Sequence, residues 1–184
     1  MLFGTNITSD VLRYLPNIKV WFLDYNINDN YEYLKNIKNL KVLDLLSGAK
    51  IVDNNIKNIN IEHILLSYDS KITINGLNKN IKKLGLGNNT IIKDNDLKKL
   101  NLIYLDLSHN NTINNNGLEF CKNLKILNLR CNNKITDQGL DKLKNLENLN
   151  LSIDNHYINN NITNNLLKNL TKLKFKSRKK CKYN

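Results

Sequence analysis

The chain has 184 residues, enough for one domain with a sizeable core, and 41% of them are hydrophobic. No apolar run approaches the roughly 20 residues that span a bilayer, and the N-terminus lacks the pattern of a secretory leader. The formal net charge is +12, and the three cysteines, Cys121, Cys131 and Cys181, include no close pair. An odd number of cysteines that lie far apart in the sequence does not fit a disulfide framework, so we expect reduced thiols in a cytoplasmic or nuclear protein.

The first predicted element is a cap, residues 1–17, which has the helix-like apolar spacing of later segments but no strand before it. Five apolar side chains are expected to cover the first layer of a core that continues along the chain. They are Leu2, Phe3, Ile7, Leu12 and Leu15.

Seven units follow in residues 18–169, and each begins with apolar residues at positions 1, 4 and 6 of the unit. Inward positions 4 and 6 alternate with outward positions 3, 5 and 7, which predicts a short strand in every unit. The units repeat every 20 to 24 residues. The triplets are Ile18/Trp21/Leu23, Leu40/Leu43/Leu45, Ile61/Ile64/Leu66, Ile81/Leu84/Leu86, Leu102/Leu105/Leu107, Leu124/Leu127/Leu129 and Leu146/Leu149/Leu151.

The second half of each unit is predicted to be a short helix or turn that returns the chain to the next strand. Positions 12, 17 and 20 are apolar about one helical turn or more apart, as in Ile135, Leu140 and Leu143. No unit can bury its own apolar edge, so successive units must stack around one core. Asn114, Asn115 and Asn116 are expected on an exposed part of this return, where composition alone accounts for them.

Position 9 predicts a ladder of side chains along the stack. An amide there can donate and accept hydrogen bonds where the chain leaves the strand and backbone groups lack ladder partners. The residues are Asn26, Asp69, Asn89, Asn110, Asn132 and Asp154, with Gly48 as the interruption.

The pattern L-x-x-L-x-L-x-x-N, at steps of 20 to 24 residues, resembles the leucine-rich repeat. The segment ITDQGLDKL at 135–143 is similar to the cysteine-containing subtype found behind F-boxes in ubiquitin-ligase receptors. The resemblance implies an α/β fold, a curved leucine-rich repeat solenoid with parallel strands on the concave face and short helices or turns on the convex face. We expect no F-box, because no stretch long enough for one precedes the first unit.

The function predicted from this fold is non-enzymatic binding of another protein through the concave face, by a monomer. Several outward strand positions are apolar where polar residues are usual, which favours a protein interface. The β-propensity of Val, Ile and Tyr is the alternative explanation. The predicted contact residues are Val20, Phe22, Val42, Asp44, Leu46, His63, Leu65, Tyr104, Asp106, Ile126, Asn128 and Arg130, with Asp44, Asp106 and Arg130 as a charged rim.

No catalytic residue, cofactor or metal site is predicted. The three histidines, His63, His109 and His156, fall at positions 3, 8 and 11 of different units and do not converge. Cys121 and Cys131 fit structural roles better than nucleophilic ones.

Residues 170–184 are predicted to form a partial terminal strand, with its triplet at Leu170, Leu173 and Phe175, and a basic tail. Lysines 172, 174 and 176 are expected on the outward face of that strand, where they discourage edge pairing. The tail residues Arg178, Lys179, Lys180 and Lys182 are expected beyond the strand. They leave an alternative function open, binding of nucleic acid or an anionic surface. The family resemblance leaves another, substrate capture for a ubiquitin ligase whose F-box lies on another chain.

Overall fold

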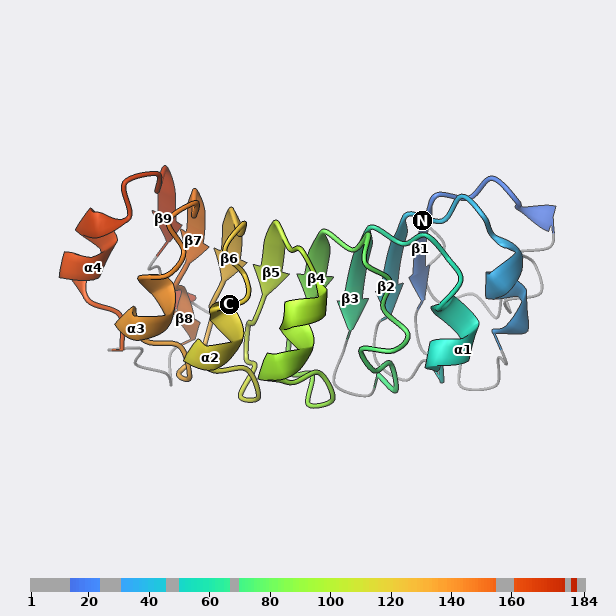
Figure 1. Ribbon diagram of the computed structural model, residues 1–184, viewed down its shortest axis with the longest axis horizontal. Coiled ribbons are helices and arrows are strands. Elements are labelled where there is room, and N and C mark those ends of the chain that lie inside the picture. The colour runs from blue at the N-terminus through green and yellow to red at the C-terminus, as the bar shows by residue number, and fades with distance from the viewer. Residues whose placement is uncertain are drawn as a thin grey trace.

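The computed structural model describes residues 14–23, 31–45, 50–66, 70–154, 161–177 and 180–181. Eight parallel strands form one open sheet in the order β1-β2-β3-β4-β5-β6-β7-β9, so the sheet gains one strand with each repeat (Figure 1). The strands are β1 (Val20–Leu23), β2 (Val42–Leu45), β3 (His63–Leu66), β4 (Lys83–Gly85), β5 (Tyr104–Asp106), β6 (Ile126–Asn128), β7 (Asn148–Asn150) and β9 (Phe175–Ser177).

Short helical returns connect these strands and lie on one side of the sheet (Figure 1). They are η2 (Glu32–Asn36), α1 (Asp53–Ile56), η3 (Asp94–Lys99), α2 (Asn115–Leu118), α3 (Asp137–Leu140) and α4 (Asn164–Asn169). Between β3 and β4 the described residues, 70–82, form turns without a helix. There the Asn78 side chain donates to the carbonyl oxygens of Ile59 and Ile61 in the preceding repeat at 2.8 and 3.3 Å, which joins the two repeats.

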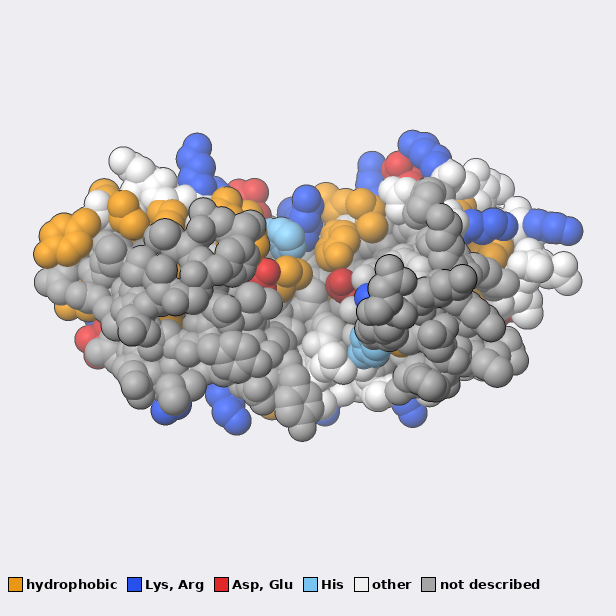
Figure 2. Space-filling view, turned by 180° about the vertical axis from the view of Figure 1, so that it is seen from behind, with side chains coloured by type: hydrophobic (Ala, Val, Ile, Leu, Met, Phe, Trp, Pro, Cys, Tyr) orange, Lys and Arg blue, Asp and Glu red, His pale blue; other side chains and the backbone are white. Residues whose placement is uncertain are grey.

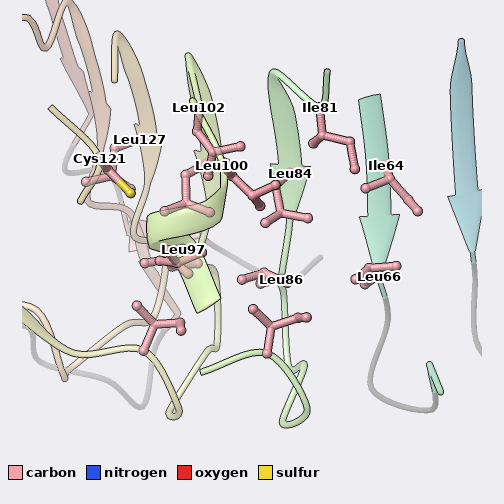
Figure 3. Packing of buried hydrophobic residues seen from close by; sticks show 14 of the residues in the cluster. Ile64, Leu66, Ile81, Leu84, Leu86, Leu97, Leu100, Leu102, Cys121 and Leu127 are labelled. Carbon is pink, nitrogen blue, oxygen red and sulfur yellow. The ribbon is translucent and has the colours of Figure 1, made fainter. Parts of the chain in front are cut away.

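The core is one column of side chains between the sheet and the returns. Strand register stacks Leu84 directly beside Ile64 and Leu105, so each inward residue packs against its equivalents in the neighbouring repeats. Figure 3 shows Leu97 and Leu100 of a return next to Leu84 of a strand. All five of these side chains are buried, as the triplet and return positions predict.

The predicted alternation of a strand with a short helix or turn is therefore confirmed for the repeats that the structure describes. The last repeat differs from its predicted register. Asn148 of β7 pairs with Phe175 of β9, 27 residues later, whereas 22 residues separate Ile126 from its partner Asn148. The triplet predicted at Leu170, Leu173 and Phe175 is therefore wrong by three positions.

The cause is a longer seventh repeat. Ile162 is buried where Ile135 is buried one repeat earlier, again 27 residues away, so the extra residues precede Ile162. Leu173 then occupies position 1, and its backbone N–H donates to the carbonyl oxygen of Leu170 as the N–H of Leu146 does to Leu143. Five inserted residues between β7 and α4 explain the shift.

The new register also moves the terminal lysines. Lys176 pairs with Leu149, so by register it takes the inward position and not the outward one predicted, although its side chain is exposed at this end of the stack. The side chains of Lys174 and Lys172 contact the preceding repeat, through Glu147 at 2.9 Å and Asn145 at 2.6 Å. Lys180 does not lie beyond the strands, because β10 (Lys180–Cys181) pairs in parallel with β8 (Ile153–Asp154). The other predicted tail residues, Arg178, Lys179 and Lys182, lie outside the described residues.

Candidate protein-interaction surface

The outward residues at positions 3, 5 and 7 of β1 to β7 form a surface that we call the sheet face. Figure 2 views the molecule from the side opposite to the helical returns, and hydrophobic, acidic and histidine side chains lie close together near the middle of this view. Strand pairing brings ten predicted contact residues onto this one face: Val20, Phe22, Val42, Asp44, His63, Leu65, Tyr104, Asp106, Ile126 and Asn128. Arg130 lies in a turn two residues after the end of β6, and Leu46 lies outside the described residues.

The part of the sheet face on β1 to β3 is largely apolar. Val20 and Phe22 of β1 are 43% and 38% exposed, and Val42 and Leu65 on the next two strands are half-buried. In β4 the outward Gly85 has no side chain, and a Cβ there would collide with Cδ2 of Leu65. Leu65 thus leans over Gly85 and extends the apolar surface toward the middle of the sheet.

Asp44 lies inside this apolar area and is not part of a rim. Its register partners are Phe22 and Leu65, and only 9% of its surface is exposed. Burial raises the pKa of the Asp44 carboxyl above its ordinary value, because the charged form loses hydration that apolar neighbours do not replace. The predicted charged rim is therefore wrong at this position.

Asp44→Asn is expected to stabilise the fold by about 1 kcal/mol at pH 7, since it removes a poorly hydrated charge and keeps the shape. The pKa of Asp44 is raised in the folded state, so the folded protein holds the proton more tightly than the unfolded chain does. The penalty is therefore absent below the unfolded pKa and develops as the pH rises through the folded pKa. Urea melts of both proteins at pH 3 and pH 7 measure this difference. A stabilisation of equal size at both pH values would contradict it.

His63 and Tyr104 lie further along the sheet face. Their rings meet edge to face with centroids 6.2 Å apart, and Nε2 of His63 is buried without a hydrogen-bond partner among the described residues. Burial and the nearby Lys83 lower the pKa of His63, which favours the neutral ring at pH 7. Burial, with the charge of Asp106, raises the pKa of Tyr104 to about 12.

The part of the sheet face on β5 to β7 is mostly polar, with internal hydrogen bonds. Asp106 accepts from the backbone N–H of Ser108 at 2.8 Å, from Nδ2 of Asn128 at 2.9 Å and from the hydroxyl of Tyr104 at 3.4 Å. The side chain of Asn128 accepts from the backbone N–H of Arg130 at 3.1 Å. These groups hold one another in place and are already satisfied without a ligand.

The position 9 amides form hydrogen bonds between successive repeats. Nδ2 of Asn110 donates to the carbonyl oxygens of Leu86 and Asn89 at 2.6 and 3.0 Å, and Oδ1 accepts the N–H groups of Thr112 and Ile113 at 2.9 Å each. Asn132 repeats the same four contacts one repeat later. Oδ1 of Asn89 accepts two backbone N–H groups in the same way. Asn26 and Asp69, and the side chain of Asp154, lie outside the described residues.

A second ladder, not predicted from the sequence, joins the N-terminal ends of successive returns. At four described junctions an Asp or Asn accepts the backbone N–H of a Thr or Asn in the next repeat, and the two side chains also form a hydrogen bond. The pairs are Asp53–Thr73, Asp94–Asn114, Asn115–Thr136 and Asp137–Thr163. The prediction that composition alone accounts for Asn114 and Asn115 is therefore wrong.

Glycines make room for this second ladder. A Cβ added at Gly76, Gly117 or Gly139 would lie 2.5 to 2.6 Å from Oδ1 of an Asp or Asn in the preceding repeat. The sequence contained this signal. Position 14 of one unit is Asp or Asn, and position 16 of the next unit is Gly.

A third set of asparagines precedes position 1 of every unit. Pairs of these exposed side chains bond across neighbouring repeats at 2.7 to 3.2 Å, namely Asn39–Asn17, Asn80–Asn60 and Asn123–Asn101. Much of the asparagine content therefore has a structural role in stacking.

The chemical groups of the described residues show no arrangement typical of catalysis. Burial raises the pKa of the Cys121 thiol to about 12, and its Sγ donates to the carbonyl oxygen of Gly117 at 3.7 Å, so it stays protonated at neutral pH. His63 and His109 lie on different repeats. Among the described residues, no three His, Cys, Asp or Glu side chains are grouped to hold a metal ion.

A leucine-rich repeat family model matches residues 98–120 and 120–144. The solved structure of internalin C2 from Listeria monocytogenes is 27% identical, with a TM-score of 0.64, over 93% of this chain and 75% of that one. The protein is a leucine-rich repeat solenoid. Internalin F of the same organism is 26% identical, with a TM-score of 0.58, over 91% of this solenoid and 49% of its own chain.

More distant structures share the fold. A chain from the Drosophila Toll–Spatzle complex is 19% identical, with a TM-score of 0.60, and this solenoid spans 22% of its length. No curated protein matches the sequence. The cysteine-containing subtype stays a prediction. Within the described residues, no helix of the solenoid is both long and apolar enough to cross a bilayer.

Proposed function

We propose that this leucine-rich repeat solenoid is a non-enzymatic module that binds another protein through its sheet face. The observation that carries the proposal is the contiguous apolar area on β1 to β3, where Val20 and Phe22 are exposed on a strand and Leu65 covers Gly85. Exposed apolar side chains that lie together favour a protein partner, because their burial on binding releases water. Behind this area, Asp53 of one return forms two hydrogen bonds with Thr73 of the next repeat.

The comparisons support the proposal at the level of the fold. One matching chain comes from the complex of Toll with Spatzle, so the same architecture occurs in a protein assembly. The internalins, at 26% and 27% identity, share the solenoid over most of this chain. The cytoplasmic or nuclear location, a nucleic-acid role for the C-terminus and a link to a ubiquitin ligase stay predictions.

Phe22→Ala is expected to weaken binding of the partner by about 1–2 kcal/mol, roughly tenfold, with little loss of stability, because the ring is exposed. Phe120 supplies a matched control, since it has the same side chain, is 40% exposed and follows α2 on the return side. Pull-downs from cell extract with the wild type, Phe22→Ala and Phe120→Ala, with and without nuclease and across salt, measure the difference.

Partner recovery that falls for Phe22→Ala alone and resists nuclease supports the sheet face. Recovery that falls only for Phe120→Ala places binding on the opposite side. Loss of the signal on nuclease treatment, with a steep salt dependence, would instead support nucleic-acid binding.

A further inference from the structure

The sheet face carries two carboxylates among its described residues, and their surroundings are opposite. Asp106 accepts three hydrogen bonds, from Tyr104, Ser108 and Asn128. Asp44 is 9% exposed and forms no hydrogen bond or ion pair with any described residue. Among the described residues, one carboxylate therefore has its partners within the protein and the other has no polar partner.

The neighbours of Asp44 define what an outside group that pairs with it must be. Phe22 and Leu65 flank it on the two adjacent strands, and Val42 lies two residues earlier on its own strand. A partner that covers these apolar side chains would remove the remaining water from Asp44. An unpaired carboxylate in such a place is costly, whereas a charge-assisted hydrogen bond to a cation offsets the loss of water.

We propose that the partner protein presents a Lys or Arg side chain, flanked by apolar residues, to Asp44. The inference rests on the proposed function and names the chemistry of the partner that the sheet face binds. The apolar residues cover Phe22 on one side and Leu65 on the other, and the cation forms the ion pair between them.

Lys83 limits the partner to a single Lys or Arg side chain near Asp44. It is exposed at position 3 of β4, two strands from Asp44. Because paired strands lie about 4.8 Å apart, a second cation one or two strands further along would approach Lys83. The +12 net charge of the chain also opposes a generally basic partner. A neutral or acidic protein with one basic anchor residue fits best.

The test is a selection of random peptides displayed on phage, run in parallel against the full chain and Asp44→Asn. Peptides enriched on the wild type are then synthesised with their basic residue intact or replaced by norleucine. Fluorescence anisotropy gives the affinity of each for the wild type, Asp44→Asn and Phe22→Ala. Asp141→Asn is the charge-matched control, because Asp141 is exposed on the return side and pairs with Lys144.

The expected result is enrichment of apolar–Lys/Arg–apolar sequences on the wild type and not on Asp44→Asn. Asp44→Asn and the norleucine change should each weaken binding at least about tenfold, and together little more than either alone. Asp141→Asn should bind as the wild type does. Asp44→Asn should also be at least as stable as the wild type in urea, so unfolding cannot account for the lost affinity.

Three other results overturn the inference. Peptides that lack a basic residue yet lose affinity with Phe22→Ala show that the sheet face binds proteins without this cation. Peptides that are insensitive to Phe22→Ala contradict the proposed function as well. A selection that enriches no peptide shows that no short segment with this pattern is recognised.

Discussion

Asn110→Ala is expected to lower the free energy of unfolding by about 3 kcal/mol, one of the largest effects of any single polar substitution in this chain. The side chain is fully buried and forms four hydrogen bonds with backbone groups of two repeats. Alanine leaves the carbonyl oxygens of Leu86 and Asn89 and the N–H groups of Thr112 and Ile113 without these partners. Chemical denaturation in urea, monitored by circular dichroism, measures the loss.

An isosteric change separates the contribution of the Nδ2 donor of Asn110 from that of its Oδ1 acceptor. Asn110→Asp keeps the shape and the acceptor oxygen but places a second oxygen against the carbonyls of Leu86 and Asn89, so it should destabilise at least as much as alanine at pH 7. Asn111→Ala is the adjacent control, because Asn111 is exposed, and it should cost less than about 0.5 kcal/mol. Equal losses for Asn110→Ala and Asn111→Ala would show that the ladder contributes nothing.

Gly139→Ala is expected to destabilise the protein by about 2 kcal/mol, although alanine favours a helix over glycine by about 1 kcal/mol. Gly139 lies in α3, and its backbone does not adopt a left-handed conformation. The cost arises between repeats, since the new Cβ would lie 2.5 Å from Oδ1 of Asn115. That oxygen accepts the backbone N–H of Thr136 at 3.0 Å, so it cannot move away without breaking the junction.

A double-mutant cycle with Asn115→Ala tests this cause. Asn115→Ala alone should cost about 1–2 kcal/mol, because the N–H and hydroxyl of Thr136 lose a partner. In the double mutant the collision with the side chain is gone, so the cost should be at least about 1 kcal/mol below the sum of the single losses. Additive losses would mean that Gly139 and Asn115 are independent, and the glycine would need another explanation.

The repeat architecture was predictable because apolar periodicity determines both the strand and the return. Inward leucines at positions 4 and 6 and isoleucine at position 12 recur at nearly constant steps, and stacking requires only that constancy. The ladder at Asn110 and Asn132 was predictable for the same reason, since one position recurs with one amide. The last repeat was not, because Leu170, Leu173 and Phe175 have the triplet spacing but are three positions out of register with the strand that pairs with β7.

The environment of the sheet face could be predicted only in part. Sequence position places Asp44 outward on a strand, but its burial depends on how side chains of β1 and β3 lie across it. The same applies to Asp106, whose carboxylate accepts a hydrogen bond from Asn128 of the next repeat, 22 residues away. The second ladder at Asn115 did leave a sequence signal, which is Gly139 in the next unit. The signal was missed because Asn115 was attributed to the asparagine-rich composition alone.

Photo-crosslinking from a benzophenone amino acid tests whether the sheet face is the binding surface. The label is placed at Phe22 on the sheet face or at Phe120 on the return side, two rings that are 38% and 40% exposed. Binding through the sheet face predicts a discrete protein adduct from position 22, resistant to nuclease and weakened by Leu65→Ala, and none from position 120. A discrete adduct from position 120 without one from position 22 would contradict it.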